Sequence, residues 1–285
     1  MRENRISSIG AVVDGGFDTL EARLVRLKSA GCGHAELSAA ALFATLGGRE
    51  NRPRADAVAA VCAGIGMGYS VRAPAAVNLM EAARRDRHEA ALAGAMGLGR
   101  RIGARVVVVQ AGRAPPTDGA ERRRLLAVER DALRRAGDKA MVWGMVVALE
   151  NPAPCGAAVS GGATSYAVDV RALAEQIDAV DHPAVCGTLD FGRAWQAADR
   201  LGFDYLQAVR DFAPFAGHLH VSDSCAVAGE MGVPIGQGGV PYDALLCDFA
   251  VRDGCAAVLA LGRRHDAVLE AVLAEVGRIA DRLNR

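Results

Sequence analysis

The sequence lacks the features that mark membrane-spanning, secreted and nucleic-acid-binding proteins. No run of about 18 uncharged apolar residues occurs, so no membrane span is expected. The N-terminus, MRENRISSIG, has no apolar core of the kind that a signal peptide needs, and we expect a cytoplasmic protein. The formal net charge is zero, which gives no bulk sign of a surface for phosphate backbones.

Lysine and paired cysteines are also scarce. Only two of the 33 basic residues are lysines, and the arginines lie on segments with acidic neighbours (ERRRLLAVERDALRR), which is typical of a solvated helix face. The seven cysteines are odd in number and form no CxxC, so reduced, packed thiols are expected. No GxGxxG follows the first strand and no P-loop occurs, so we expect no nucleotide cofactor.

What the sequence does contain is a regular alternation of short apolar runs and helical segments. The expected strands are Arg5–Val13, His34–Ser38, Tyr69–Pro74, Ala104–Gln110, Met145–Glu150, Ala184–Asp190, Ala216–Val221 and Ala256–Leu261. Strict alternation means parallel strands with right-handed crossovers. Eight such units in 285 residues match one (β/α)₈ TIM barrel over residues 1–285 better than an open sheet.

Helices are expected between these strands. Their predicted ranges are Asp18–Ala30 (with Asp18 as the cap), Ala39–Leu46, Arg54–Ile65, Glu81–Ile102, Asp118–Val142, Ser165–Ala179, Ala194–Phe212, Pro241–Val251 and His265–Leu283. The Gly- and Pro-rich loop over residues 229–239 is either a cover for a substrate or an ordinary long connection.

Polar residues stand at the ends of strands that should be apolar. In chain order they are Glu36, Arg72, Gln110, Glu150, Asp190 with Arg193, and His218 and His220 with Asp223. In a TIM barrel these strand ends form the face that carries the chemistry, so the series predicts a site. Glu150, Asp190 and His220 make an O, O, N set that suits Mn²⁺, Zn²⁺, Co²⁺ or Mg²⁺.

Structural interpretations stand beside these. Glu36 could simply pair with a neighbouring arginine, and Arg72 could cap and orient the carboxylates. We expect His218 and His220 to point to opposite faces of their strand, so that only one enters the barrel. His218 would then be a packed or outward histidine.

The order and spacing of six motifs resemble the xylose isomerase-like TIM barrels, a superfamily of sugar isomerases and epimerases, inosose dehydratases and endonuclease IV. The motifs are YSVRAP with Asn78-Leu79, VVVVQAG, VVALEN, GTLDFGRAW, GHLHVSDS and GQGGVPYDALL, and they span nearly the whole chain. The resemblance implies a metal held by Glu150, Asp190, His220 and a carboxylate on the eighth strand. Residues 256–262 contain no such carboxylate.

Three further positions depart from the family. Its usual histidines are replaced by Arg72, Gln110 and Arg193, which argues against an endonuclease IV-like repair enzyme with its many histidine ligands. Two interpretations stay open. A cation could bind through the three ligands and water, with Gln110 or Gln237 assisting. Alternatively, the two arginines supply fixed positive charge, which suits an anionic substrate or a salt-bridged site without metal.

The resemblance implies an isomerase, epimerase or lyase that moves a proton next to the carbonyl of a small polyhydroxylated compound. The expected catalytic residues are Glu150, Arg193 and Arg72, the metal ligands Glu150, Asp190 and His220, and the substrate-binding residues Glu36, Gln110, Asp223 and Gln237. The competing hypothesis is a barrel that has lost catalysis and binds a small anionic ligand or a protein. We expect a small-molecule partner, no nucleic acid and no membrane; outward apolar helix faces would allow a homodimer.

Overall fold

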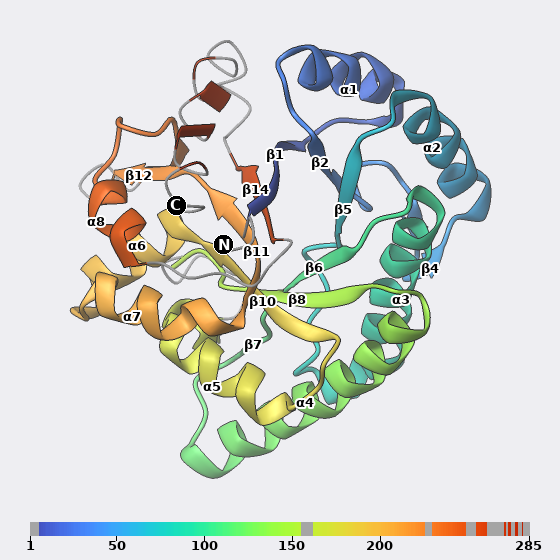
Figure 1. Ribbon diagram of the computed structural model, residues 1–285. Helices are drawn as coiled ribbons and strands as arrows, with labels where there is room; N and C mark the ends of the chain where they lie inside the picture. Colours follow the sequence, from blue (N-terminus) through green and yellow to red (C-terminus); the bar gives the residue numbers. More distant parts are fainter. Residues whose placement is uncertain are drawn as a thin grey trace.

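Eight parallel strands close into a barrel in this computed structural model, as Figure 1 shows. The structure describes residues 6–154, 162–225, 230–248 and 255–260, and 271, 273, 274, 277, 278 and 281. Around the barrel the strands are β1 (Ile6–Val13), β14 (Cys255–Leu259), β11 (Ala216–Val221), β10 (Val185–Asp190), β8 (Val146–Glu150), β6 (Val106–Gln110), β5 (Gly68–Arg72) and β2 (His34–Ser38). The prediction of a (β/α)₈ TIM barrel is therefore confirmed.

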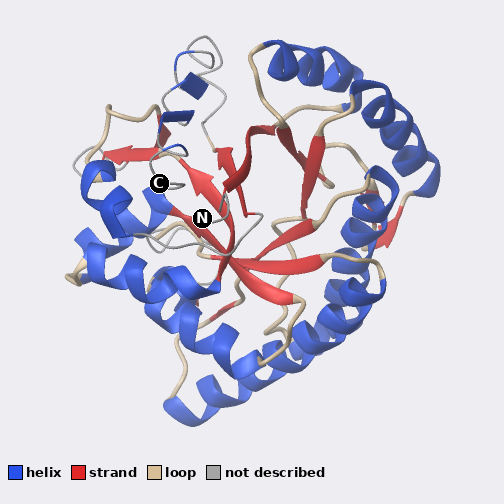
Figure 2. Ribbon diagram, in the orientation of Figure 1, coloured by secondary structure: helices blue, strands red, loops and turns tan. Residues whose placement is uncertain are grey.

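Helices surround the barrel on the outside, blue around red in Figure 2. They are α1 (Leu20–Ser29), α2 (Arg52–Ile65), α3 (Arg85–Ile102), α4 (Gly119–Val142), α5 (Val170–Val180), α6 (Phe191–Leu201), α7 (Tyr205–Phe212) and α8 (Tyr242–Asp248). Short 3-10 turns lie at η1 (Phe17–Thr19), η2 (Ala82–Arg84), η3 (Tyr166–Val168) and η4 (Ala213–Phe215). Three two-stranded sheets decorate the loops: β3 (Thr45–Leu46) with β4 (Arg49–Glu50), β7 (Arg113–Ala114) with β9 (Thr164–Ser165), and β12 (Asp223–Cys225) with β13 (Glu230–Val233).

The strand sequences are continuous apolar runs because both faces of each strand are buried, one inside the barrel and one beneath the helices. Val107, Val147 and Leu149 are almost completely buried. On β10, a Cβ added at Gly187 would lie 2.3 Å from Cζ of Phe212, so the glycine lets α7 pack closely against the sheet. The core thus lies between the barrel and its helices, and it leaves the strand ends to polar side chains.

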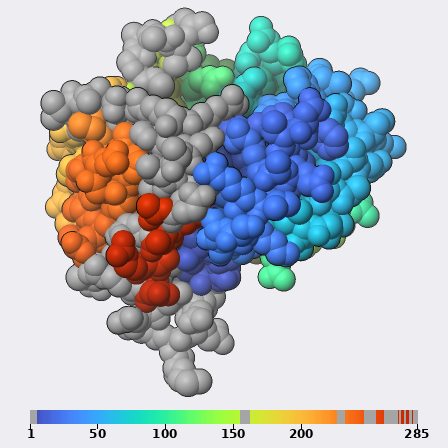
Figure 3. Space-filling model, turned by 90° about the horizontal axis from the view of Figure 1, so that it is seen from above, coloured from blue at the N-terminus to red at the C-terminus, as the bar shows by residue number. Residues whose placement is uncertain are grey.

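Closure of the barrel brings its first and last strands together. β1 pairs in parallel with β14, in the register Ile9 to Ala257 and Gly10 to Val258. In the space-filling view of Figure 3, blue N-terminal residues accordingly lie beside red residues from late in the chain. A site at one end of the barrel can therefore draw on residues more than 180 positions apart, as Glu36 and His218 illustrate.

Two local predictions were wrong. Residues 39–46 form turns and β3 instead of a helix, because the Ser38 hydroxyl accepts the Ala41 N–H at 3.2 Å and Phe43 adopts a φ of 53°. Asp18 lies inside η1, and α1 begins after Thr19 with no side-chain cap. Most of the expected last helix lies outside the described residues, and so do residues 249–251 at the end of the helix expected over Pro241–Val251.

Within the described part of the chain, no helix has the length and apolar character needed to cross a membrane. Among the described residues, Cys32, Cys62, Cys186 and Cys255 are buried, as expected of packed cysteines.

Candidate active site

Five strands deliver polar side chains to one end of the barrel. Glu36 comes from β2, Arg72 from β5, Glu150 from β8, Asp190 from β10 and His220 from β11. The Glu36, Glu150 and His220 residues are fully buried, and Asp190 is nearly so. The parallel register explains their proximity, because Asp190 pairs with His220 in the β10–β11 ladder. The structure thus brings together the residues that strand ends alone suggested.

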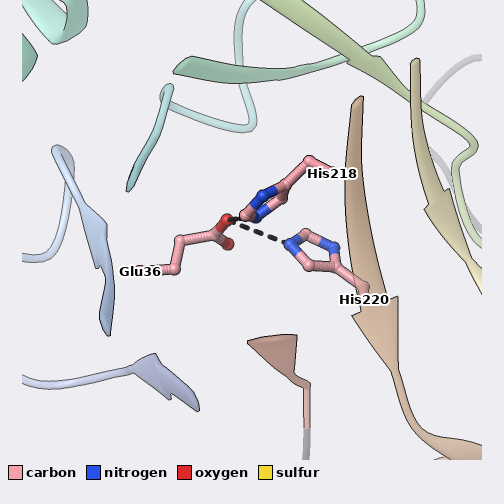
Figure 4. A group of neighbouring side chains, drawn as sticks. All are labelled: Glu36, His218 and His220. Atoms are coloured by element: carbon pink, nitrogen blue, oxygen red, sulfur yellow. Dashed lines mark hydrogen bonds and ion pairs between the residues drawn. The ribbon is translucent and has the colours of Figure 1, made fainter. Parts of the chain in front are cut away.

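Glu36 is the acceptor for two histidines (Figure 4). The Nε2 atoms of His218 and His220 each lie 3.0 Å from Oε2 of Glu36. The prediction that the two histidines point to opposite faces was therefore wrong. Side chains alternate along a strand with a period of two, so residues i and i+2 share one face. His218 is fully buried, and its Nδ1 has no hydrogen-bond partner.

The other oxygen of Glu36 binds Arg72. Nε and Nη2 of Arg72 lie 3.0 Å and 2.8 Å from Oε1 of Glu36. The Ser70 hydroxyl donates to Oε2 at 3.3 Å and lies 3.0 Å from Nε2 of His34. The pairing of Glu36 with an arginine, one of the two interpretations of this residue, is present, and it extends into a buried network of histidines.

Glu150 lies between an imidazole and a guanidinium. Its Oε1 is 2.6 Å from Nδ1 of His220 and 3.0 Å from Nη1 of Arg193. Its Oε2 is buried and has no hydrogen-bond partner. Among the described carboxylates of this cluster, it is the one oxygen that is buried and has no hydrogen-bond partner.

Asp190 fixes the position of Arg193 by capping α6. Oδ1 of Asp190 accepts the backbone N–H of Arg193 at 3.0 Å, as an N-cap aspartate does, and Oδ2 lies 3.0 Å from Arg193 Nε. Asn151, immediately after β8, exchanges two hydrogen bonds with the Asp190 backbone at 2.7 Å and 3.1 Å. The Asn151 carbonyl also accepts a bond from Arg193 Nη1 at 3.3 Å.

Opposite charges in this cluster stabilise the ionised forms of their neighbours, as the pKa shifts show. Burial by itself would raise the pKa of Glu36, but His220 and Arg72 hold it well below its usual value. Burial acts in the same sense on the Glu150 carboxyl, and Arg193 and His220 lower its pKa instead. For His220, burial opposes the charged form, yet Glu36 and Glu150 raise its pKa to about 9. Burial dominates for His218, whose pKa is lowered. The cluster therefore holds ionised carboxylates, a charged His220 and a neutral His218.

The remaining predicted residues lie at the edge of this cluster. Gln110 ends β6 in register with Glu150 and is half-buried. Asp223 is buried, and its two oxygens accept the backbone N–H groups of Ser224, Gly236, Gly238 and Val240. Asp223 thereby shapes the loop that carries Gln237, which is exposed. Their substrate-binding roles stay predictions.

The roles of two residues in this cluster, Asn151 and His218, were not predicted from the sequence. Asn151 was not singled out from the sequence as a site residue, and His218 was interpreted as a packed or outward histidine. The signal for His218 was its spacing of two from His220. For Asn151 it was a position next to Glu150 at the end of a buried strand, where a polar side chain needs a partner.

Two groups of described residues have donor atoms within 4.8 Å of one another, as a metal would require: Glu36, His218 and His220, and Glu150, Asp190 and His220. The residue types of the second group fit a divalent metal, but their arrangement does not. Arg193 stands between the two carboxylates, and both nitrogens of His220 face carboxylate oxygens. The guanidinium places a positive charge where a cation would have to lie, and within this second group Oε2 of Glu150 is the one ligand atom that has no hydrogen-bond partner.

Known structures share this fold at low sequence identity. A D-tagatose 3-epimerase-like protein has a TM-score of 0.74 and 16% identity, with 97% of this chain and 98% of that chain covered. An L-ribulose 3-epimerase has a TM-score of 0.69 and 17% identity, with 98% and 95% covered. The IOLI protein with a binding zinc atom has a TM-score of 0.71 and 14% identity, with 97% and 98% covered.

A comparison with curated protein sequences found no match. The family model described as xylose isomerase-like TIM barrel, however, matches residues 14–251. That range contains every residue of the cluster at the strand ends. With its closed eight-stranded barrel and this match over most of its length, the chain belongs to the xylose isomerase-like TIM barrel family.

Proposed function

We propose that this protein is an isomerase or epimerase that moves a proton next to the carbonyl group of a small polyhydroxylated compound. The observation that carries the proposal is the buried Oε2 of Glu150, an ionised carboxylate oxygen without a partner, beside Arg193 and His220. Structural neighbours named as a D-tagatose 3-epimerase-like protein and an L-ribulose 3-epimerase support the same class of reaction.

In the proposed reaction, Glu150 takes the proton from the carbon next to the carbonyl. The electron pair of that C–H bond forms the C=C bond of an enediolate, and the carbonyl π electrons move to its oxygen. Protonation of the same carbon on its opposite face, with the carbonyl re-formed, gives the epimer. Protonation of the former carbonyl carbon, with the hydroxyl proton passed between the two oxygens, gives the isomer. Because the pKa of Glu150 is lowered, the carboxylate is ionised but weakly basic, and the reaction depends on positive charge at the enediolate oxygen.

Arg193, Arg72 and the charged His220 are the groups that can supply this charge. The side chains of Arg193 and Arg72 keep 18% and 22% of their surface exposed, so a substrate can reach them. Gln110 and Gln237 are proposed to bind substrate hydroxyl groups. The metal-assisted form of the reaction, favoured by the zinc in the IOLI protein, would require the guanidinium of Arg193 to leave the two carboxylates.

The test is solvent exchange. The purified protein is incubated in D₂O with a panel of ketoses, aldoses and sugar acids, with and without Mn²⁺, and the hydrogen next to the carbonyl is followed by NMR. We expect deuterium to enter this position in at least one compound. The Glu150→Gln variant should exchange about 100-fold more slowly or not at all, whereas Glu21→Gln, on the exposed surface of α1, should match the wild type.

Exchange that persists unchanged in Glu150→Gln would remove Glu150 from the mechanism. Absence of exchange across the whole panel would count against an isomerase. Binding of an anionic compound without exchange would favour the second candidate, a barrel that binds a ligand without turning it over. The observation behind that candidate is the sequence of β14, CAAVL, which offers no carboxylate.

A further inference from the structure

We infer that Arg193 is the resident cation of this site and that its guanidinium stands where a divalent metal would otherwise join Glu150 and Asp190. The inference deepens the proposed function by naming its source of positive charge, and it rests on that function only where it gives the charge a role in the reaction. The arrangement of the charges can be tested without a substrate.

The contacts of Arg193 are those of a bridging cation. Its Nη1 lies 3.0 Å from Oε1 of Glu150, and its Nε lies 3.0 Å from Oδ2 of Asp190. The two carboxylates come from the ends of neighbouring strands, β8 and β10, whose ladder places Thr188 opposite Glu150. Both carboxylate groups are buried, so each needs a positive or hydrogen-bonding partner, and the same guanidinium serves both.

The main chain holds this guanidinium in place. The backbone N–H of Arg193 donates to Oδ1 of Asp190, while its side chain binds Oδ2 of the same residue. Asp190 is in turn held by two hydrogen bonds with Asn151, whose carbonyl accepts a bond from Arg193 Nη1. A swing of the side chain away from the site would therefore break contacts to three residues at once.

Because arginine keeps its positive charge, a divalent metal cannot bind between Glu150 and Asp190 while Arg193 occupies that position. A guanidinium stays protonated under all ordinary conditions, so it cannot become a neutral ligand. A dication placed between the same two carboxylates would lie within a few ångströms of that positive charge, in a buried setting where repulsion is strong. Removal of the Arg193 charge should instead leave two adjacent buried carboxylates with an excess of negative charge, which is a setting that attracts a divalent cation.

The experiment measures metal binding and thermal stability. Wild type, Arg193→Ala and Arg193→Met are stripped with a chelator, dialysed, and melted with and without MnCl₂ or CoCl₂. Bound metal is measured by mass spectrometry. The control is Arg171→Ala, because Arg171 likewise binds the N-cap aspartate of its helix, Asp169, through its backbone N–H and its side chain, but at α5, outside the site.

We expect the wild type and Arg171→Ala to retain only trace metal and to melt at the same temperature with and without Mn²⁺ or Co²⁺. We expect Arg193→Ala or Arg193→Met to gain stoichiometric metal and a metal-dependent rise of several degrees in Tm. A wild type that keeps stoichiometric metal, or that Mn²⁺ stabilises, would overturn the inference without deciding whether the protein is an isomerase. So would Arg193 variants that fold but bind no metal. If neither variant folds, the wild-type measurement alone decides.

Discussion

The imidazole of His220 and the carboxylate of Glu150 lie 2.6 Å apart, Nδ1 to Oε1, and both side chains are fully buried. The second ring nitrogen, Nε2, faces Glu36 at 3.0 Å. One imidazole thus joins two buried carboxylates, and it does so best when both nitrogens carry a proton. The charge of His220 is therefore part of what holds the strand ends together.

This contact predicts a loss of stability at alkaline pH. The pKa of His220 is raised from 6.5 to about 9 in the folded protein, so the stabilisation is complete below about pH 6.5 and is lost as the pH rises through 9. The loss is on the order of 3 kcal/mol. Denaturant unfolding of wild type and His220→Gln across this range should show a steeper decline for the wild type. Parallel profiles would mean that His220 is neutral in the folded state.

Glu36→Ala should be strongly destabilising, by about 3–5 kcal/mol, because Arg72 and the two histidines lose their shared acceptor in a buried setting. Glu36→Gln keeps the shape and one acceptor oxygen, so its loss should be smaller. The exposed carboxylate of Glu21 provides the control, and Glu21→Ala should stay within about 0.5 kcal/mol of wild type. Equal stability of the Glu36→Ala and Glu21→Ala variants in urea would contradict the network.

Asn151→Ala should lower activity indirectly, because it should disturb the position of Arg193. The amide holds the Asp190 backbone, and Asp190 orients Arg193. We expect a loss of about 1–3 kcal/mol in stability, because two buried backbone groups lose partners. Once a substrate is known, kcat should fall more than KM rises. An unchanged kcat in a folded variant would show that Arg193 keeps its place without Asn151.

The hydrogen bonds of Glu129 allow a prediction about the stability of the loops and helices that pack against α4. This fully buried residue of α4 accepts bonds from Gly112 N–H at 2.7 Å, Tyr166 Oη at 2.6 Å and Gln176 Nε2 at 3.0 Å. Tyr166→Phe removes one bond and should cost about 1 kcal/mol, whereas Glu129→Ala removes the acceptor that three donors share and should cost about 3 kcal/mol or more. Equilibrium unfolding measures both. A smaller loss for Glu129→Ala than for Tyr166→Phe would contradict this assignment.

Local patterns predicted most of the strands and helices because the chain repeats one unit. An apolar run such as VVVV before Gln110 has few alternatives to a buried strand, and Asp118 caps α4 as its position suggests. The prediction failed over residues 39–46, where small residues are compatible with a helix but the Ser38 side chain and the β3–β4 pairing favour turns. Local propensity there is too weak to resist tertiary contacts.

The candidate site, too, was predicted in part from local sequence and depends in part on tertiary contacts. Strand ends identified Glu36, Arg72, Glu150, Asp190, Arg193 and His220 as neighbours, because parallel strands bring their ends to one face. Their positions at the strand ends do not predict which carboxylate oxygen faces which cation. The distance between Glu36 and His220 depends on closure of the barrel across 184 positions of chain. The shared face of the two histidines, in contrast, follows from strand geometry and could have been predicted.

By itself, the sequence determined the architecture and the inventory of the site: eight βα units, polar residues at the strand ends, no carboxylate on the eighth strand, and arginines at two positions where the resemblance implies histidines. Tertiary structure decided how these charges pair. It placed the Arg193 guanidinium between Glu150 and Asp190 and set Glu36 against both histidines. The reason is physical: backbone pattern is encoded locally, whereas a buried charge takes the partner that barrel closure brings within hydrogen-bond distance.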